Sequence, residues 1–206
     1  MARARGVDAI VDSAHAWGQI DFNVRDLGMD FAGFNLHKWM GAPLGVGVLY
    51  IRKERIPDID VFMASDEHSV ADVRARVHSG TSNFAAFLTV PQALDFQETI
   101  GIRAKEARLR SLRDLWAERF RGHGSIQILT PADPRLYGGI TSLRLEGRTT
   151  SADNVALAKK LLDQHGIFTV HRTGVAAGDC VRVTPALFTS RDHIERLVKA
   201  LETIAA

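Results

Sequence analysis

Two side chains near the start of the sequence, Asp12 and Lys38, each follow a short apolar run. Asp12 comes directly after residues 9–11, Ala-Ile-Val, and Lys38 closes the segment 34–38, which overlaps a second apolar stretch. An acid and an amine at two strand ends are the pair that a pyridoxal phosphate (PLP) enzyme needs, because a lysine forms the Schiff base and a carboxylate keeps the pyridine nitrogen protonated. The pair predicts Lys38 as a catalytic residue and Asp12 as a cofactor-binding residue.

Three neighbouring side chains are candidates to complete such a site. His15 follows Asp12 closely and could reach the ring oxygen of the cofactor, whereas Asn35 and His37 could serve its phosphate or its ring. Taken singly, each residue also has a simpler interpretation. An aspartate after a strand is commonly a turn or cap residue, and a lysine in a loop is commonly just exposed. The residue types alone leave both interpretations open.

Short apolar strands are predicted to position these residues. Segments 9–11, 31–34 and 45–51 are apolar without a polar–apolar alternation, which is typical of an α/β sheet covered on both faces. In open α/β sheets, ligands gather at the carboxyl ends of the strands. Asp12 and Lys38 both fall at such ends, so we expect them to share one edge of the sheet.

From residue 84 onward the pattern becomes helical. An apolar face over 84–100 predicts a helix that starts late or kinks at Pro91, since proline is poorly tolerated inside a helix. A long charged amphipathic helix follows and ends at Gly122. Its apolar positions, at steps of three and four, are Leu109, Leu112, Leu115, Trp116 and Phe120.

The remaining residues predict a small α+β unit. The expected elements are strands at 126–129, 140–145, 167–170 and 181–183, a helix from an N-cap at Ser151 to about Gly166, and a last helix after Ser190. The last helix is expected to bury Ile194, Leu197, Val198, Leu201 and Ile204. The change of pattern along the chain predicts two domains, 1–95 and 96–206.

The motifs around the reactive residues follow one another in a specific order. Segment 11–18 reads Val-Asp-Ser-Ala-His-Ala-Trp-Gly, segment 26–31 reads Asp-Leu-Gly-Met-Asp-Phe, and segment 35–43 reads Asn-Leu-His-Lys-Trp-Met-Gly-Ala-Pro. This order of acid, histidine, His-Lys pair and glycine-rich strand closely resembles the class V aminotransferase family, which contains isopenicillin-N epimerase-like proteins, cysteine desulfurases and kynureninases. The resemblance covers essentially the whole chain. It implies the C-terminal part of a PLP-transferase large domain, with a mainly parallel sheet, followed by a smaller α+β domain.

The resemblance also implies two site residues further along the chain. Segment 80–84, Gly-Thr-Ser-Asn-Phe, looks like the family's Gly-Thr-x-Asn turn, in which the threonine, here Thr81, reaches the cofactor phosphate of the neighbouring subunit. Arg182, in the segment 181–185, resembles the arginine that holds the substrate carboxylate in a two-pronged bond. We therefore expect a homodimer with an amino-acid substrate.

The sequence departs from the family pattern in two respects. Family members are roughly twice as long, so the resemblance implies that the usual N-terminal part is lacking here, as in a fragment or a truncated reading frame. Desulfurases carry a reactive cysteine in a loop after a segment like 171–174, whereas here the loop 175–179 has none and Cys180 follows inside a strand. We interpret Cys180 as a buried apolar residue, which disfavours desulfurase activity.

Composition sets the remaining bounds. With 206 residues, 46% hydrophobic and 24% charged, the chain has the balance of a soluble globular protein, and its net charge of +2 does not indicate nucleic-acid binding. A single cysteine excludes an internal disulfide. No apolar run is long enough to cross a bilayer, and His68, His78 and His171 lack metal-ligand spacing. We expect a cytoplasmic protein with no metal, membrane or nucleic-acid partner.

Our leading hypothesis is a PLP-dependent enzyme that acts at the α-carbon of an amino acid and is closest to the isopenicillin-N epimerase-like branch. Two alternatives remain within the same fold: a catalytically inactive remnant or interaction module, and a cysteine desulfurase-like or lyase-like enzyme. A third is an unrelated nucleotide-binding sheet. The sequence does not name the substrate, nor does it choose among racemisation, transamination and elimination.

Overall fold

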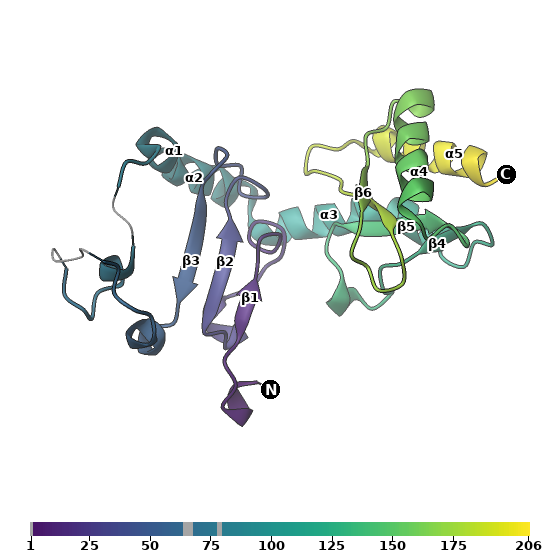
Figure 1. The fold of residues 1–206 in the computed structure, drawn as a ribbon. Coiled ribbons are helices and arrows are strands. Elements are labelled where there is room, and N and C mark those ends of the chain that lie inside the picture. Colours follow the sequence, from purple (N-terminus) through teal and green to yellow (C-terminus); the bar gives the residue numbers. More distant parts are fainter. Residues whose placement is uncertain (1, 64–67, 78–79) are drawn as a thin grey trace. The chain divides into compact units, whose positions relative to one another are not determined.

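The computed structural model describes residues 2–63, 68–77 and 80–206 (Figure 1). The chain divides into two compact units: the first ends at Ile102 and the second begins at Arg103. The predicted domain boundary after residue 95 falls inside helix α2 (Val90–Ile100), whereas the observed division lies between Ile102 and Arg103, in the first turn of helix α3 (Ile102–Ala117).

The first unit is built on a sheet of three strands in the order β1-β2-β3 (Figure 1). Strand β1 (Ile10–Asp12) runs parallel to β2 (Phe31–Asn35), and β3 (Gly47–Ile51) runs antiparallel to β2. The three strands agree with the predicted ones to within two residues at each end. Asp12 is paired with Gly33 and Asn35 ends β2, so both polar residues lie at the carboxyl ends of neighbouring parallel strands.

Among the described residues, side chains cover one face of this sheet and leave apolar side chains exposed on the other, whereas the strand pattern is typical of a sheet covered on both faces. Ala32 and Phe34 on the covered face are 1% and 4% exposed, because side chains from the segment between β1 and β2 pack over them. On the opposite face, Ile10 and Leu49 are 80% and 67% exposed. The apolar runs identify strands correctly, but they do not identify which other elements lie over each face.

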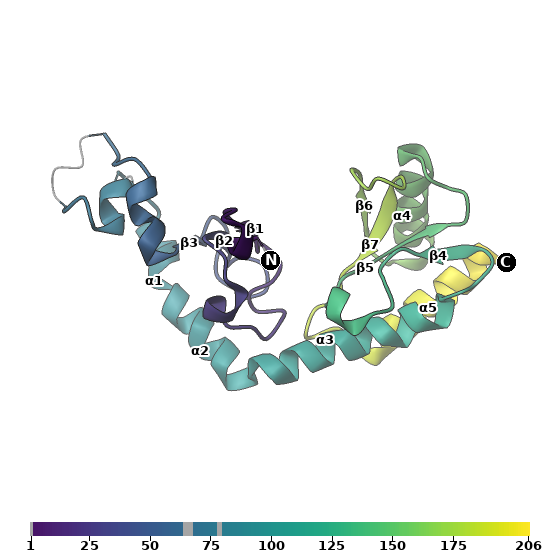
Figure 2. The same cartoon turned by 90° about the horizontal axis from the view of Figure 1, so that it is seen from below.

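Two short helices follow the sheet, end to end (Figure 2). Helix α1 (Phe84–Leu88) is capped by the side chain of Asn83, which accepts a hydrogen bond from the Ala86 amide, and α2 (Val90–Ile100) begins at once. Pro91 lies in the first turn of α2, where its missing N–H removes no helical hydrogen bond. The predicted break at Pro91 is therefore confirmed.

The second unit is α+β, as predicted. Its sheet has the order β4-β5-β7-β6 with every pair antiparallel (Figure 2). The strands are β4 (Ile126–Ile128), β5 (Thr141–Leu145), β6 (Val170–Arg172) and β7 (Cys180–Val183), and the helices are α3 (Ile102–Ala117), α4 (Ser151–His165) and α5 (Arg191–Ala205). Apolar side chains from the three helices and from one face of the sheet form a single core. Its completely buried members are Leu112, Trp116, Ala117, Leu143, Leu161, Val181 and Leu201.

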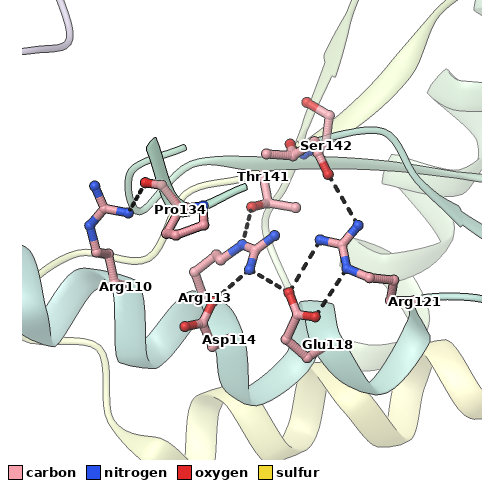
Figure 3. A network of polar contacts seen from close by, with 9 residues as sticks. Arg110, Arg113, Asp114, Glu118, Arg121, Pro134, Thr141 and Ser142 are labelled. Carbon is pink, nitrogen blue, oxygen red and sulfur yellow. Dashed lines mark hydrogen bonds and ion pairs between the residues drawn. The ribbon is translucent and has the colours of Figure 1, made fainter. Parts of the chain in front are cut away.

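A buried arginine ties α3 to this sheet (Figure 3). The Arg113 side chain is 0% exposed, and its guanidinium lies 2.6 Å from one carboxylate oxygen of Asp114 and 2.6 Å from one of Glu118. It also donates to the Thr141 hydroxyl on β5 at 3.0 Å. Hydrogen bonds from Arg121 and then from Arg113 lower the pKa of Glu118, so this carboxylate stays charged across the neutral range.

Three details of the second unit differ from the prediction. The N-cap of α4 is Thr150 rather than Ser151, because the Thr150 hydroxyl accepts from the Asp153 amide and Asp153 bonds back to the Thr150 amide. The predicted strand at 167–170 begins only at Val170. Ile204 is partly buried at the rim of the core, whereas the other four predicted apolar positions of α5 are buried. Among the described helices, none has the length and apolar character that a bilayer crossing requires.

Candidate active site

Asp12 lies at the end of β1 with its carboxylate exposed. One carboxylate oxygen accepts a hydrogen bond from the Ala14 amide at 3.0 Å, which makes Asp12 the first residue of a turn as well as the last of a strand. The Ser13 amide donates to the Gly33 carbonyl at 2.9 Å and continues the pairing with β2. The sheet therefore fixes the backbone of Asp12 and leaves its second carboxylate oxygen accessible.

Lys38 lies in a turn that follows β2 and is held by its apolar neighbours. Leu36 and Met40 are 2% and 4% exposed and anchor the turn from inside. The Leu36 amide donates to the Val46 carbonyl at 3.1 Å, and the Ala42 amide donates to the Leu36 carbonyl at 3.0 Å. Lys38 itself is exposed, so a rigid turn presents a flexible, accessible amine.

His15 connects the segment after β1 to the turn after β2. The Lys38 amine lies 3.4 Å from His15 Nε2, and the Trp39 indole N–H donates to His15 Nδ1 at 3.1 Å. The imidazole and indole rings meet edge to face at 69°. The structure thus brings together His15 and Lys38, two of the residues that the sequence predicts for the site.

The indole contact determines which nitrogen of His15 carries the proton. Because an indole N–H can only donate, His15 Nδ1 must accept and is unprotonated in this arrangement. The proton of the neutral ring then lies on Nε2, the nitrogen that faces Lys38. The nitrogen of His15 that faces the Lys38 amine is thus the one that can exchange a proton with it, and the neutral amine is the nucleophilic form of lysine.

Gly18 allows the close approach that this arrangement needs. Its φ is +81°, in the left-handed region that favours glycine. A Cβ atom at this position would lie 2.9 Å from the carbonyl carbon and oxygen of Trp39 and 2.7 Å from the sulfur of Met40. A larger residue at position 18 would therefore push away the turn that carries Lys38.

Asn35 and His37 contact each other beside the same turn. Their Nδ2 and Nε2 atoms are 3.4 Å apart, so the amide can donate to the imidazole. His37 Nδ1 then carries the ring proton, and this atom is buried without a hydrogen-bond partner among the described residues. An unpaired donor of this kind would suit a phosphate or ring oxygen, which is the role predicted for His37 and Asn35.

Thr81 and Arg182 lie outside this group. Thr81 is exposed, two residues before the α1 cap Asn83, and no hydrogen bond from it to Asp12, His15 or Lys38 is found among the described residues. Arg182 belongs to β7 of the second unit, where it is paired with Ser142 on one side and Val170 on the other. Its side chain is half-buried, and its Nε has no partner within the described part of the chain.

Cys180 is 1% exposed in β7, as predicted for a small apolar residue. A buried thiol without a described cationic partner is a poor nucleophile. Within the described residues, no group of three His, Cys, Asp or Glu side chains gathers in metal-binding geometry, and His78 lies outside the described residues.

Three features of the residues present fit PLP. They are an accessible amine on a rigid turn, a histidine beside it, and a buried imidazole nitrogen that has no partner among the described residues, and a phosphorylated aldehyde needs functional groups of these kinds. Lys38, His15, His37, Asn35 and Asp12 are the residues that would hold it. The sequence did not predict the role of Trp39, because nothing local in the pattern shows that its indole reaches back to His15.

Comparison with known proteins agrees with this chemistry. The family model described as aminotransferase class-V matches residues 1–197. The isopenicillin N epimerases of Streptomyces clavuligerus and Amycolatopsis lactamdurans are 29% and 30% identical to this chain, over 98% and 99% of its length and 54% of theirs. The chain thus spans about half the length of the curated relatives it matches.

Solved structures show the same fold. The apo cysteine desulfurase of Thermococcus onnurineus superimposes with a TM-score of 0.79 at 24% identity, over 99% of this chain and 54% of the other. A K223A mutant of C-DES, solved with glycine covalently linked to its PLP cofactor, superimposes with a TM-score of 0.73 at 22% identity, over 95% of this chain and 51% of the other. Both likenesses concern the fold, and the second connects that fold with PLP.

Proposed function

Because the chain belongs to the class V aminotransferase family, we propose that its first unit carries the lysine side of a PLP site that acts at the α-carbon of an amino acid. The observation that carries the proposal is the 3.4 Å contact between the Lys38 amine and His15 Nε2, which joins the segments after two parallel strands. In this proposal the first unit is the C-terminal part of the large PLP-binding domain, and the second is the small domain.

When bound, PLP supplies an electron sink that acidifies the α-hydrogen of an amino acid. Lys38 holds the cofactor and moves a proton at the α-carbon, for which its neutral form is required. His15 contacts the amine through Nε2, and Trp39 fixes the orientation of the His15 ring through Nδ1. Asp12 supplies the carboxylate that keeps a ring nitrogen protonated, and its accessible second oxygen supports this role.

Arg182 is proposed to bind the substrate carboxylate. A guanidinium whose Nε has no partner among the described residues can form two parallel hydrogen bonds to a carboxylate. The central place of Arg182 in its sheet holds the arginine backbone on both sides. A fixed arginine orients the α-carbon of the bound amino acid and thereby selects which of its bonds breaks.

Epimerase-like chemistry is favoured over desulfurase chemistry. The most similar curated relatives include two isopenicillin N epimerases, and the only cysteine, Cys180, is buried in β7. A desulfurase needs an accessible thiolate to take sulfur from its substrate, and Cys180 does not supply one. We further propose a cytoplasmic homodimer in which Thr81 reaches the cofactor phosphate of the partner subunit.

Covalent attachment of PLP tests the proposal. The full chain is incubated with PLP, reduced with borohydride and digested, and peptide mass spectrometry locates the modified lysine. We expect modification at Lys38 in the wild-type chain and its loss in Lys38→Ala. Lys53→Ala, which removes another exposed lysine of the first unit, should leave the modification at Lys38 unchanged.

The same experiment decides against the proposal if modification is spread evenly over exposed lysines, or if a folded wild-type chain takes up no PLP. The second result would favour the alternative in which the chain is an inactive remnant or an interaction module of this fold. Circular dichroism of each variant establishes that the chain is folded. Because Lys38 is exposed, its removal should not disturb the core.

A further inference from the structure

The two faces of the sheet in the second unit differ in kind. On one face, residues such as Leu143 and Val181 pack into the core. The other face carries the alternate positions, because directly paired residues of an antiparallel sheet point to the same side. The strand positions on this second face are Gln127, Ser142, Arg144, Val170, Arg172, Cys180 and Arg182. They include three arginines and no carboxylate.

Arg144 is the arginine of this face whose N–H donors are already hydrogen-bonded, to neutral oxygens. Its guanidinium donates to the Gln127 side chain at 2.6 Å and to the carbonyl oxygens of Ala177 at 2.7 Å and Asp179 at 3.4 Å. These bonds hold the loop before β7, and Arg144 is 4% exposed. Arg144 is therefore structural, and it shows what a satisfied arginine looks like in this sheet.

Arg172 and Arg182 are in a different state. Arg172 is exposed at the end of β6, and Arg182 is half-buried with an unpaired Nε. No carboxylate forms an ion pair with either one among the described residues. Burial, and after it the positive charge of Arg172, lower the pKa of Arg182. A guanidinium whose charge is disfavoured by a neighbouring guanidinium lies in a positive field that an anion would relieve.

The register brings the two arginines together. Arg172 is paired with Cys180, which lies two residues before Arg182 on β7. Arg172 and Arg182 are thus diagonal neighbours on one face, with backbones about 7–8 Å apart. The long side chains can each approach a separate carboxylate of one short molecule, because a guanidinium reaches well beyond its own strand.

We propose that Arg172 binds a second acid group of the substrate, so that this sheet face selects an amino acid with a distal carboxylate. The proposal rests on the proposed function, in which Arg182 holds the α-carboxylate. Arg172 would then discriminate between side chains, because a substrate with an apolar end leaves this guanidinium without an anion. The ligand class is a short dicarboxylate whose α-carbon bears the amino group.

Two acids of equal length test the proposal without PLP. Glutarate and valerate each have five carbons and differ in the second carboxylate. Calorimetric titration of the full chain should show glutarate binding about tenfold more tightly than valerate, the size expected for one added charge-assisted contact. Arg172→Gln should reduce glutarate to the affinity of valerate, while valerate binding to that variant stays unchanged.

Three further variants complete the test. Arg182→Gln should weaken both acids, and Arg182→Lys covers the case in which the half-buried glutamine variant fails to fold. Arg191→Gln, which removes an exposed arginine of α5, should change neither affinity. Equal binding of glutarate and valerate to the wild-type chain would overturn the proposal, as would a glutarate preference that survives in Arg172→Gln.

The result is independent of the PLP experiment. If the chain prefers glutarate but does not attach PLP at Lys38, the proposed function is contradicted and the dicarboxylate site is still supported. If the chain attaches PLP at Lys38 but does not distinguish glutarate from valerate, the proposed function is supported and the dicarboxylate site is contradicted. If sulfate alone competes glutarate away as strongly from Arg172→Gln as from the wild-type chain, the site is a general anion surface and the proposal fails.

Discussion

The two units of the chain hold themselves together in different ways. In the second unit, helices and one sheet face enclose a core in which Trp116, Leu143 and Leu201 are 0% exposed. In the first unit, one sheet face is covered, while Ile10 and Leu49 on the other are 80% and 67% exposed. The residues proposed to attach the cofactor therefore lie on the less enclosed unit. Reactive groups commonly occupy such regions, because packing there leaves room for a ligand.

Substituting one leucine in each unit tests this difference in packing most directly. Leu201→Ala removes a completely buried side chain of the second core and should lower the free energy of unfolding by about 2–5 kcal/mol. Leu49→Ala removes a leucine of the open sheet face and should change it by less than about 0.5 kcal/mol. Urea denaturation followed by circular dichroism compares the two variants. Similar losses in both would mean that the two units do not differ in packing as described.

Two arginines provide a polar version of the comparison. Arg113→Ala leaves Asp114, Glu118 and Thr141 without their shared donor and opens a cavity under α3, so we expect a loss of about 3 kcal/mol. The estimate is at the low end for a buried ion pair, because both carboxylates are partly exposed and water can solvate them. Arg119→Ala, which breaks an exposed pair with Glu202, should cost less than about 1 kcal/mol. Thermal unfolding measures both.

Trp39→Phe examines the first unit, where a hydrogen bond rather than packing fixes the reactive group. The variant keeps an aromatic ring but loses the donor to His15 Nδ1, so the imidazole should become a mixture of its two neutral tautomers. The ¹⁵N shifts of the His15 ring at a pH of about 8, above the ordinary histidine range, report the tautomer. Trp116→Phe is the control in the second unit. A His15 ring with unchanged shifts in Trp39→Phe would contradict the tautomer assignment.

The smallest effect is expected at the edge of the second sheet, where Asp179 accepts from the Ser151 hydroxyl and lies 2.8 Å from His171 Nε2. Hydrogen bonds from Ser151 and then from His171 lower the pKa of Asp179 below 3.8. A lowered carboxyl pKa adds stability at neutral pH, and this stability is lost as the pH falls below about 4 toward the pKa of the folded state. The melting temperature of Asp179→Asn should therefore fall less than that of the wild type as the pH is lowered through this range. An equal fall in both proteins would argue against the contact.

Local patterns in the sequence predict much of this architecture. The strand that ends at Asp12, the strand that precedes the Lys38 turn, the break at Pro91 and the buried face of α5 all follow from features within a few residues. The cap of α4 shows the limit of such patterns: Thr150 and Ser151 are both good caps, and only the reciprocal bond with Asp153 decides between them. The late start of β6 depends on pairing with β7, which is not a local property.

The site shows the same limit more sharply. His15 and Lys38 are predicted from their types, and the structure adds that they touch. The sequence did not predict the role of Trp39 or the role proposed for Arg172. Trp39 donates to His15 in a distant segment, and Arg172 lies on the strand beside that of Arg182. Their partners are set by how turns and strands fold back on each other. A pattern read along one segment carries no information about such contacts.

Gly18 has a consequence for how this protein can vary. Any side chain at that position would meet the backbone of Trp39, so a single added methyl group would separate the histidine segment from the lysine turn. A library randomised at position 18 and sorted for attachment of PLP at Lys38 should return glycine almost alone. The same library sorted only for folding of the second unit should accept every residue. The residue at position 18 would then decide whether a chain can attach PLP at Lys38, without affecting whether its second unit folds.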